Sequence, residues 1–129
     1  MNYYAKLKII ISGQENLYLL DAQLKNEEGK YLITFVKDID GLQFAFEIVS
    51  DEEVALYRKG EISGDMYFLS GRKTRNVLSC EYGNINYFIL THSIKIERTE
   101  REFLLKINYE SINLGNDGES EIELLLQKQ

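Results

Sequence analysis

The stretch YGNINYFILTHSIKIE, Tyr82–Glu97, decides the fold class of this 129-residue chain. After a Tyr-Gly-Asn turn it alternates for about a dozen residues, which is the period of a β-strand. At about 3.3 Å per residue the strand is roughly 40 Å long, too long to lie flat on one small sheet. We therefore expect it to bend and to pair with different neighbours along its two halves, as in a closed or nearly closed sheet. The alternation places on one face Phe88, Leu90, His92, Ile94 and Ile96.

Runs with the same period precede and follow this stretch, joined by short turns containing Gly, Asn and Asp. Together they predict an all-β fold, a single antiparallel up-and-down meander of about ten strands, and closing the meander into a barrel removes its exposed edges. A short helix competes only at 51–59, DEEVALYRK, where Asp51 is a possible cap, but Gly60 and the flanking strands favour a hairpin. The expected strands are 5–12, 17–25, 30–37, 43–50, 54–59, 62–69, 75–81, the long strand, 102–111 and 119–127.

Length and composition limit the class of protein. The chain is the size of one domain, so we expect a single barrel domain over residues 1–129. Its formal net charge of −6 argues against unspecific nucleic-acid binding, which needs a concentrated basic surface. The N-terminus interrupts its apolar residues with Lys6 and Lys8 and reads as a strand, without a targeting or membrane-spanning segment. A single cysteine, Cys80, cannot form an internal disulfide, so a reduced, cytoplasmic location is expected.

A barrel of about ten strands is wider than the eight-stranded kind that side chains just fill, so either large aromatics occupy it or a cavity remains. Arg58 shares a face with Val54 and Leu56 and could clamp a carboxylate or phosphate with its two-pronged donors. The alternative role for Arg58 is to close a barrel end on backbone carbonyls or on a tyrosine. His92, if it lines the barrel, is an ionisable group in an apolar lumen; the alternative is a core or rim histidine hydrogen-bonded to a tyrosine.

No set of residues indicates catalysis or a cofactor. One histidine and one cysteine give no metal-ligand spacing, and there is no serine nucleophile elbow. Gly71–Arg75 lacks the order of a phosphate-binding loop and opens a strand instead of a helix. We expect no catalytic residues, no metal and no cofactor, and an enzyme is the least favoured class.

Six short motifs resemble those of the YwiB-like proteins, small bacterial proteins of unknown function. They are GKYLITF at 29–35, LYRKG at 56–60, MYF at 66–68, EYG at 81–83, LTHSIKI at 90–96 and LKINYE at 105–110. The resemblance implies a calycin-like, lipocalin-type β-barrel and no particular activity. Where the family tends to have a Thr and often a Pro before its aromatic-Gly turn, this chain has Cys80 and Glu81, so any chemistry of that threonine would be missing here.

Two functions remain open. The first is non-enzymatic binding of a small apolar or amphipathic ligand inside the barrel, an expectation that rests partly on fold-level analogy. The second is a filled barrel that acts as an interaction module or homodimer through exposed tyrosines; a monomer fits the first function. The predicted ligand-binding residues are Arg58, His92, Tyr31, Phe44, Phe46, Phe68 and Phe88. The tyrosines of the second function are Tyr18, Tyr57, Tyr67 and Tyr87.

Overall fold

The computed structural model describes residues 2–114 and 118–129, and in these ranges it contains strands and turns but no helix. The predicted all-β antiparallel meander of ten strands is confirmed, and the strand at Glu53–Lys59 excludes the competing helix. The strands are β1 (Asn2–Ile11), β2 (Gln14–Glu27), β3 (Lys30–Phe35), β4 (Gln43–Ser50), β5 (Glu53–Lys59), β6 (Gly64–Leu69), β7 (Lys73–Cys80), β8 (Gly83–Arg98), β9 (Glu102–Ile112) and β10 (Gly118–Lys128).

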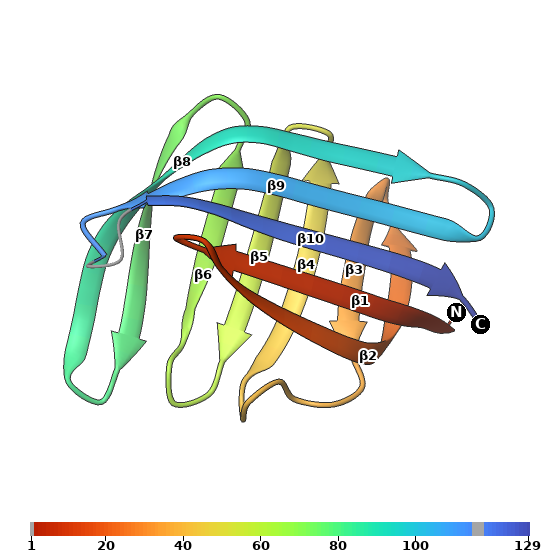
Figure 1. The fold of residues 1–129 in the computed structure, drawn as a ribbon, viewed down its shortest axis with the longest axis horizontal. Coiled ribbons are helices and arrows are strands. Elements are labelled where there is room, and N and C mark those ends of the chain that lie inside the picture. Colours follow the sequence, from red (N-terminus) through yellow and green to blue (C-terminus); the bar gives the residue numbers. More distant parts are fainter. Residues whose placement is uncertain (1, 115–117) are drawn as a thin grey trace.

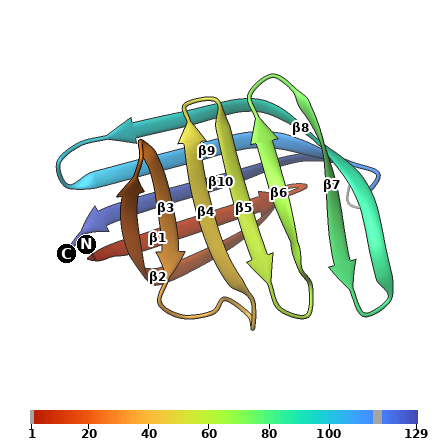
Figure 2. The same cartoon turned by 180° about the vertical axis from the view of Figure 1, so that it is seen from behind.

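All ten strands form one sheet in the order β6-β5-β4-β3-β2-β1-β10-β9-β8-β7. The sheet folds over on itself, so that β1, β9 and β10 cross β3 to β7 at a steep angle (Figure 1). The same crossing is seen from behind in Figure 2, where β3 to β7 lie in front. The two longest strands, β2 and β8, bend so that each runs from one set of crossing strands to the other. β8 pairs with β7 along its first half and with β9 along its second, which confirms the bend expected from its length.

Tight turns set the register of the hairpins. Ser12 and Gly13 both have positive φ, at 49° and 84°, and Glu28 and Gly29 repeat this at 52° and 83°. Two consecutive positive φ angles give the turn whose twist matches that of paired strands. Because side chains alternate between faces, each register fixes which residues point into the barrel. β9 shows this alternation clearly, with every second residue from Phe103 to Tyr109 buried.

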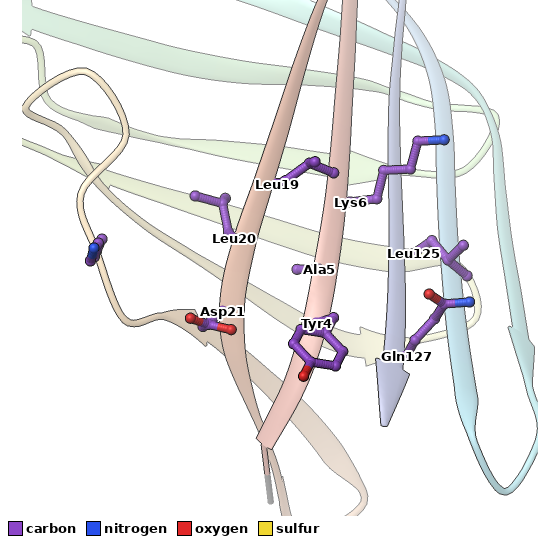
Figure 3. A pocket seen from close by; sticks show the side chains of 9 residues that line it. Tyr4, Ala5, Lys6, Leu19, Leu20, Asp21, Leu125 and Gln127 are labelled. Atoms are coloured by element: carbon purple, nitrogen blue, oxygen red, sulfur yellow. The ribbon is translucent and has the colours of Figure 1, made fainter. Parts of the chain in front are cut away.

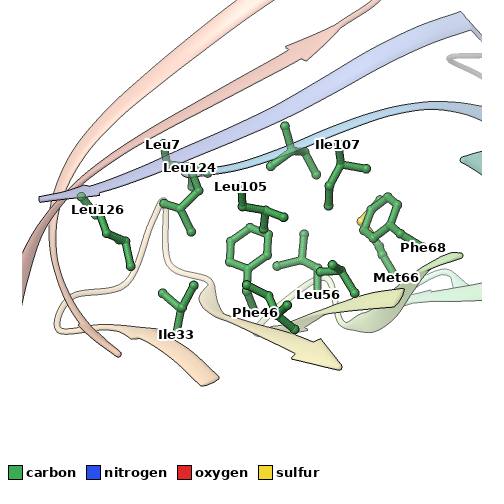
Figure 4. Close-up of a cluster of buried hydrophobic side chains, with 14 of the residues drawn as sticks. Leu7, Ile33, Phe46, Leu56, Met66, Phe68, Leu105, Ile107, Leu124 and Leu126 are labelled. Carbon is green, nitrogen blue, oxygen red and sulfur yellow. The ribbon is translucent and has the colours of Figure 1, made fainter. Parts of the chain in front are cut away.

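The core lies between the two layers. Phe46 on β4 and Phe68 on β6 meet Leu105 and Ile107 on β9 and Leu124 on β10, and all five are almost completely buried. Figure 4 shows these side chains filling the space between the crossing strands. The middle of the barrel is therefore packed with side chains.

The barrel closes at a seam between β6 and β7, the two ends of the sheet order. Two backbone hydrogen bonds join Ser63, just before β6, to Ser79 on β7, with N–O distances of 2.8 and 2.7 Å. Farther along β6 and β7, side chains form hydrogen bonds to backbone groups of the facing strand. The Tyr67 amide donates to Asn76 Oδ1 at 2.9 Å, and the Thr74 hydroxyl donates to the Tyr67 carbonyl at 2.6 Å. The barrel is thus nearly closed, and two polar side chains complete its seam.

Candidate functional site

The structure distributes the predicted ligand-binding residues over different parts of the barrel. Phe46 and Phe68 belong to the packed middle, where neither has appreciable exposed surface (Figure 4). The Phe68 ring stands edge-on to Tyr109 with centroids 5.1 Å apart. These two phenylalanines face inward, as the alternation predicts, but they fill the barrel and do not line an open space.

Tyr31 lies at one end of the barrel and helps to close it. Its ring packs against Phe103, with centroids 5.5 Å apart, and the guanidinium of Arg98 lies over the Tyr31 ring at 4.9 Å. A cation over an aromatic face is an attractive contact that also excludes solvent. One arginine and two rings thus stack at this end of the barrel and border a polar hollow of about 330 Å³ that also contains Glu100 and Glu102. Tyr31 pairs with one end of β4 and Arg58 with the other, so the two do not share a site.

Phe44 and Arg58 lie at the opposite end, beside a cavity of about 240 Å³. Leu56, Met66 and Ile122 are buried residues in its lining, and among the described lining residues Arg58 alone carries a charge. We call this space the barrel-end cavity. Its lining residues are Ile9, Ile11, Leu42, Phe44, Leu56, Arg58, Ile62, Met66, Tyr87, Tyr109, Ser111, Leu114, Ser120 and Ile122.

Strand alternation places Arg58 in the cavity. On β5 the inward residues are Val54, Leu56 and Arg58, so the arginine is the last inward residue before the turn that begins at Gly60. Its Nε donates to the Gly64 carbonyl at 3.4 Å and its Nη2 to the Tyr87 hydroxyl at 3.5 Å. These two hydrogen bonds match the alternative role expected for Arg58, which was contact with backbone carbonyls or a tyrosine at a barrel end.

Two tyrosine hydroxyls share the cavity with Arg58. Burial raises the pKa of Tyr109 to about 12, against a smaller lowering by a hydrogen bond with Ser120. Burial also raises the pKa of Tyr87, although the neighbouring Arg58 charge acts in the opposite direction. Both phenols are therefore protonated at neutral pH and can donate hydrogen bonds into the cavity.

The expected placement of His92 and Phe88 inside the barrel is wrong. A bulge between Thr91 and Ser93 inserts His92 as an unpaired residue, and one inserted residue exchanges the two faces of a strand. Before the bulge the inward residues are therefore Tyr87, Ile89 and Thr91, and after it they are Ile94 and Ile96. Tyr87, expected on the outer face, is buried for the same reason.

Outside the barrel, Phe88 and His92 have polar partners. The Phe88 ring carries Lys73 Nζ above it at 4.5 Å. The Nε2 of His92, whose side chain is 44% exposed, lies 3.2 Å from Glu110 Oε2. His92 is thus neither a lumen residue nor a core histidine bonded to a tyrosine.

The described residues include one group with the ligand types of a divalent-cation site. Donor atoms of His92, Glu110 and Glu119 lie within 4.8 Å of one another, and imidazole with carboxylates suits several divalent metals. Sequence spacing did not reveal the group because its two carboxylates come from β9 and β10. It faces solvent outside the barrel and is separate from the barrel-end cavity.

A larger hollow lies on the outer face of the sheet. It measures about 440 Å³ and runs along β1, β2 and the end of β10, as Figure 3 shows for Tyr4, Lys6, Leu19 and Gln127. Leu19 is 77% exposed there and Tyr4 59%. This depression lies on the outside of the sheet, whereas the barrel-end cavity lies between inward-facing side chains and opens to solvent at a rim that includes Ile11 and Ile62. Its mostly apolar lining makes the smaller space the better candidate for small-molecule binding.

Tyr87, one of the four tyrosines expected at an interaction surface, is buried instead of exposed. Tyr57 and Tyr67 donate to Glu47 and Asp65 on the outside of β4 to β6. Tyr18 donates to Asp40 beside a different turn. An interaction role for these three tyrosines stays a prediction.

Sequence reasoning missed most of the cavity. Arg58 and Phe44 were identified from strand alternation, but Tyr109 was not named as a site residue, and the inward position of Tyr87 depends on the bulge. Ser111 and Ser120 are small inward residues at the ends of β9 and β10. Small side chains at a barrel end leave space there, which is the signal in the sequence that could have located the cavity.

Comparison with known proteins places the chain in a family. Residues 9–126 match the family model described as Domain of unknown function (DUF1934). The crystal structure of the ywiB protein from Bacillus subtilis has a similar fold, with a TM-score of 0.78 and 17% sequence identity, over 99% of this chain and 90% of that chain. No curated protein matches the chain. Among the described residues, no helix is long and apolar enough to cross a membrane. The chain therefore belongs to the DUF1934 family and has a YwiB-like barrel.

Proposed function

We propose that the protein binds one small apolar or amphipathic molecule in the barrel-end cavity, without catalysing a reaction on it. The observation that carries the proposal is the lining of the barrel-end cavity. Its space of about 240 Å³ is bordered mainly by apolar inward side chains, with Arg58 as the one charged residue among the described lining residues. The hollow of about 330 Å³ at the other end is bordered by three charged residues, Arg98, Glu100 and Glu102.

The size of the cavity limits the ligand. An engineered apolar cavity of about 150 Å³ binds benzene, so by proportion about 240 Å³ accommodates roughly ten non-hydrogen atoms. A sterol or a long lipid chain is too large to be enclosed. A short aliphatic or single-ring molecule fits, held by contact with Leu56, Met66 and Ile122 and by removal of its apolar surface from water.

The chain contains a convenient reporter of binding, because its two methionines are Met1 and Met66 and Met66 lines the cavity. With [methyl-13C]methionine, titration with 1-octanol is expected to shift the Met66 methyl resonance to saturation, with Met1 as an internal reference. Because the ligand binds only the folded barrel, 1-octanol at about 100 times its Kd should raise the free energy of unfolding by about 2.7 kcal/mol.

Ser111→Phe supplies the matched test of location, since Ser111 is a small residue facing the cavity. The added ring should fill the space and abolish the octanol-dependent shift. Ser93→Phe makes the same change at an exposed position on β8 and should bind octanol as the wild type does. If neither octanol nor octanoate moves the Met66 resonance of the wild type, the barrel is filled and the proposal fails. A stable dimer in the same preparation would then favour the interaction module.

A further inference from the structure

Arg58 has more hydrogen-bonding capacity than its surroundings use. The guanidinium carries five N–H donors, and it makes two long hydrogen bonds with described residues, at 3.4 Å to Gly64 O and 3.5 Å to Tyr87 Oη. Among the described residues no carboxylate lies within ion-pair distance of Arg58. A half-buried cation that has no ion-pair partner among the described residues is costly, so an anion that enters the cavity gains attraction and hydrogen bonds together.

The groups around Arg58 also favour an oxyanion. The Tyr87 hydroxyl is in hydrogen-bond contact with the guanidinium, and Tyr109 lines the same space. Both hydroxyls remain protonated at neutral pH because burial raises the pKa of each phenol. A carboxylate can therefore accept from a planar cationic fork and from a neighbouring phenol, a combination that gives strong, oriented hydrogen bonds.

The position of Arg58 along β5 sets the orientation of such a ligand. Leu56 and Met66 lie farther from the end of the barrel and are buried, whereas Ile11 and Ile62 at the rim are partly exposed. A charged head group held by Arg58 thus sits near the mouth, and an apolar tail points toward Leu56 and Met66.

We propose that the ligand of the barrel-end cavity is a small amphipathic carboxylic acid, bound as its anion with the carboxylate on Arg58 and Tyr87. This inference rests on the proposed function and narrows it to a chemical class. The three probes that test it share one eight-carbon chain: octanoate is anionic, 1-octanol is neutral and octylammonium is cationic. Binding of each is followed at neutral pH through the Met66 methyl resonance.

Octanoate is expected to bind at least tenfold more tightly than 1-octanol, and octylammonium more weakly than either. Arg58→Met retains a long apolar side chain and should remove the preference for octanoate over octanol. Tyr87→Phe should weaken octanoate binding several-fold and leave octanol unchanged. A test that needs no variant is the pH dependence in the wild type, since octanoate affinity should fall as pH drops through the range where carboxyl groups ordinarily protonate, about pH 4 to 5, while octanol affinity stays level.

The outcomes separate the two proposals. Equal affinity for octanoate and octanol, or tighter binding of octylammonium, overturns the carboxylic acid inference and leaves the cavity as a binding site. Failure of all three probes overturns the proposed function itself. Retention of the full octanoate preference by a folded Arg58→Met protein also overturns the role assigned to Arg58.

Discussion

Phe68→Ala is expected to lower the free energy of unfolding by about 3–5 kcal/mol, the usual cost of removing a buried phenylalanine ring. Phe68 has no exposed surface, and its ring meets Tyr109 edge-on across the barrel. The packed middle cannot collapse easily around the missing ring, because crossing strands hold both faces apart. Chemical denaturation at neutral pH, followed by tyrosine fluorescence and far-UV circular dichroism, measures the effect.

Phe88→Ala is the matched control, because it removes the same ring from the other face of the sheet. Phe88 is partly covered by Lys73 but lies outside the barrel, so its loss should cost about 1–2 kcal/mol, below the range for a fully buried ring. Equal losses for the two variants would contradict the face assignment that the β8 bulge imposes. They would instead favour the uninterrupted alternation expected from the sequence.

Gly64→Ala is expected to destabilise the protein by about 2–6 kcal/mol, the sum of backbone strain and overpacking. Gly64 has φ of +142°, a conformation that residues with a Cβ rarely adopt. A Cβ at this position would also meet the Val77 carbonyl oxygen across the seam. Because that atom belongs to the backbone of β7, relief requires the two strands to separate.

Gly71→Ala tests whether the effect comes from the seam. Gly71 also has positive φ, +73°, but nothing lies within 4 Å of its added Cβ, so about 1–2 kcal/mol of conformational strain is expected. Hydrogen exchange gives a second readout. In Gly64→Ala the amides of Ser63 and Ser79, which bridge the seam, should lose protection first. Similar losses of stability for the two glycine variants, with the bridge still protected, would show that the seam tolerates a side chain at position 64.

The fold could be predicted from the sequence because alternation is a local signal. On β4 and β5 the residues expected to face inward do so, including Phe46 and Leu56. Closure was also predictable in outline, since a meander of this length leaves two edges to pair. How it closes was not, because Asn76 and Thr74 replace backbone groups only after β6 and β7 approach in space.

Which residues of β8 face into the barrel could not be predicted, because both faces of the strand are apolar before the bulge. Tyr87 and Ile89 alternate with Phe88 and Leu90, so hydrophobicity does not favour either face. Register with β9 decides the matter, and it places the inserted residue at His92. Because uninterrupted alternation was assumed, His92 and Phe88 were wrongly included in the predicted site and Tyr87 was left out of it. A cavity at one end is likewise a result of packing among distant strands, which alternation does not describe.

The most direct test of the central claim, that the barrel-end cavity holds a small molecule, is native mass spectrometry of the protein purified gently from its own host. The intact mass is compared with that of the denatured chain, for the wild type and for Ser111→Phe. A stoichiometric small adduct is predicted on the native wild type, lost on denaturation and missing from Ser111→Phe, with a mass that corresponds to a carboxylic acid. A bare wild-type protein that also fails to take up added octanoate or octanol would contradict the claim.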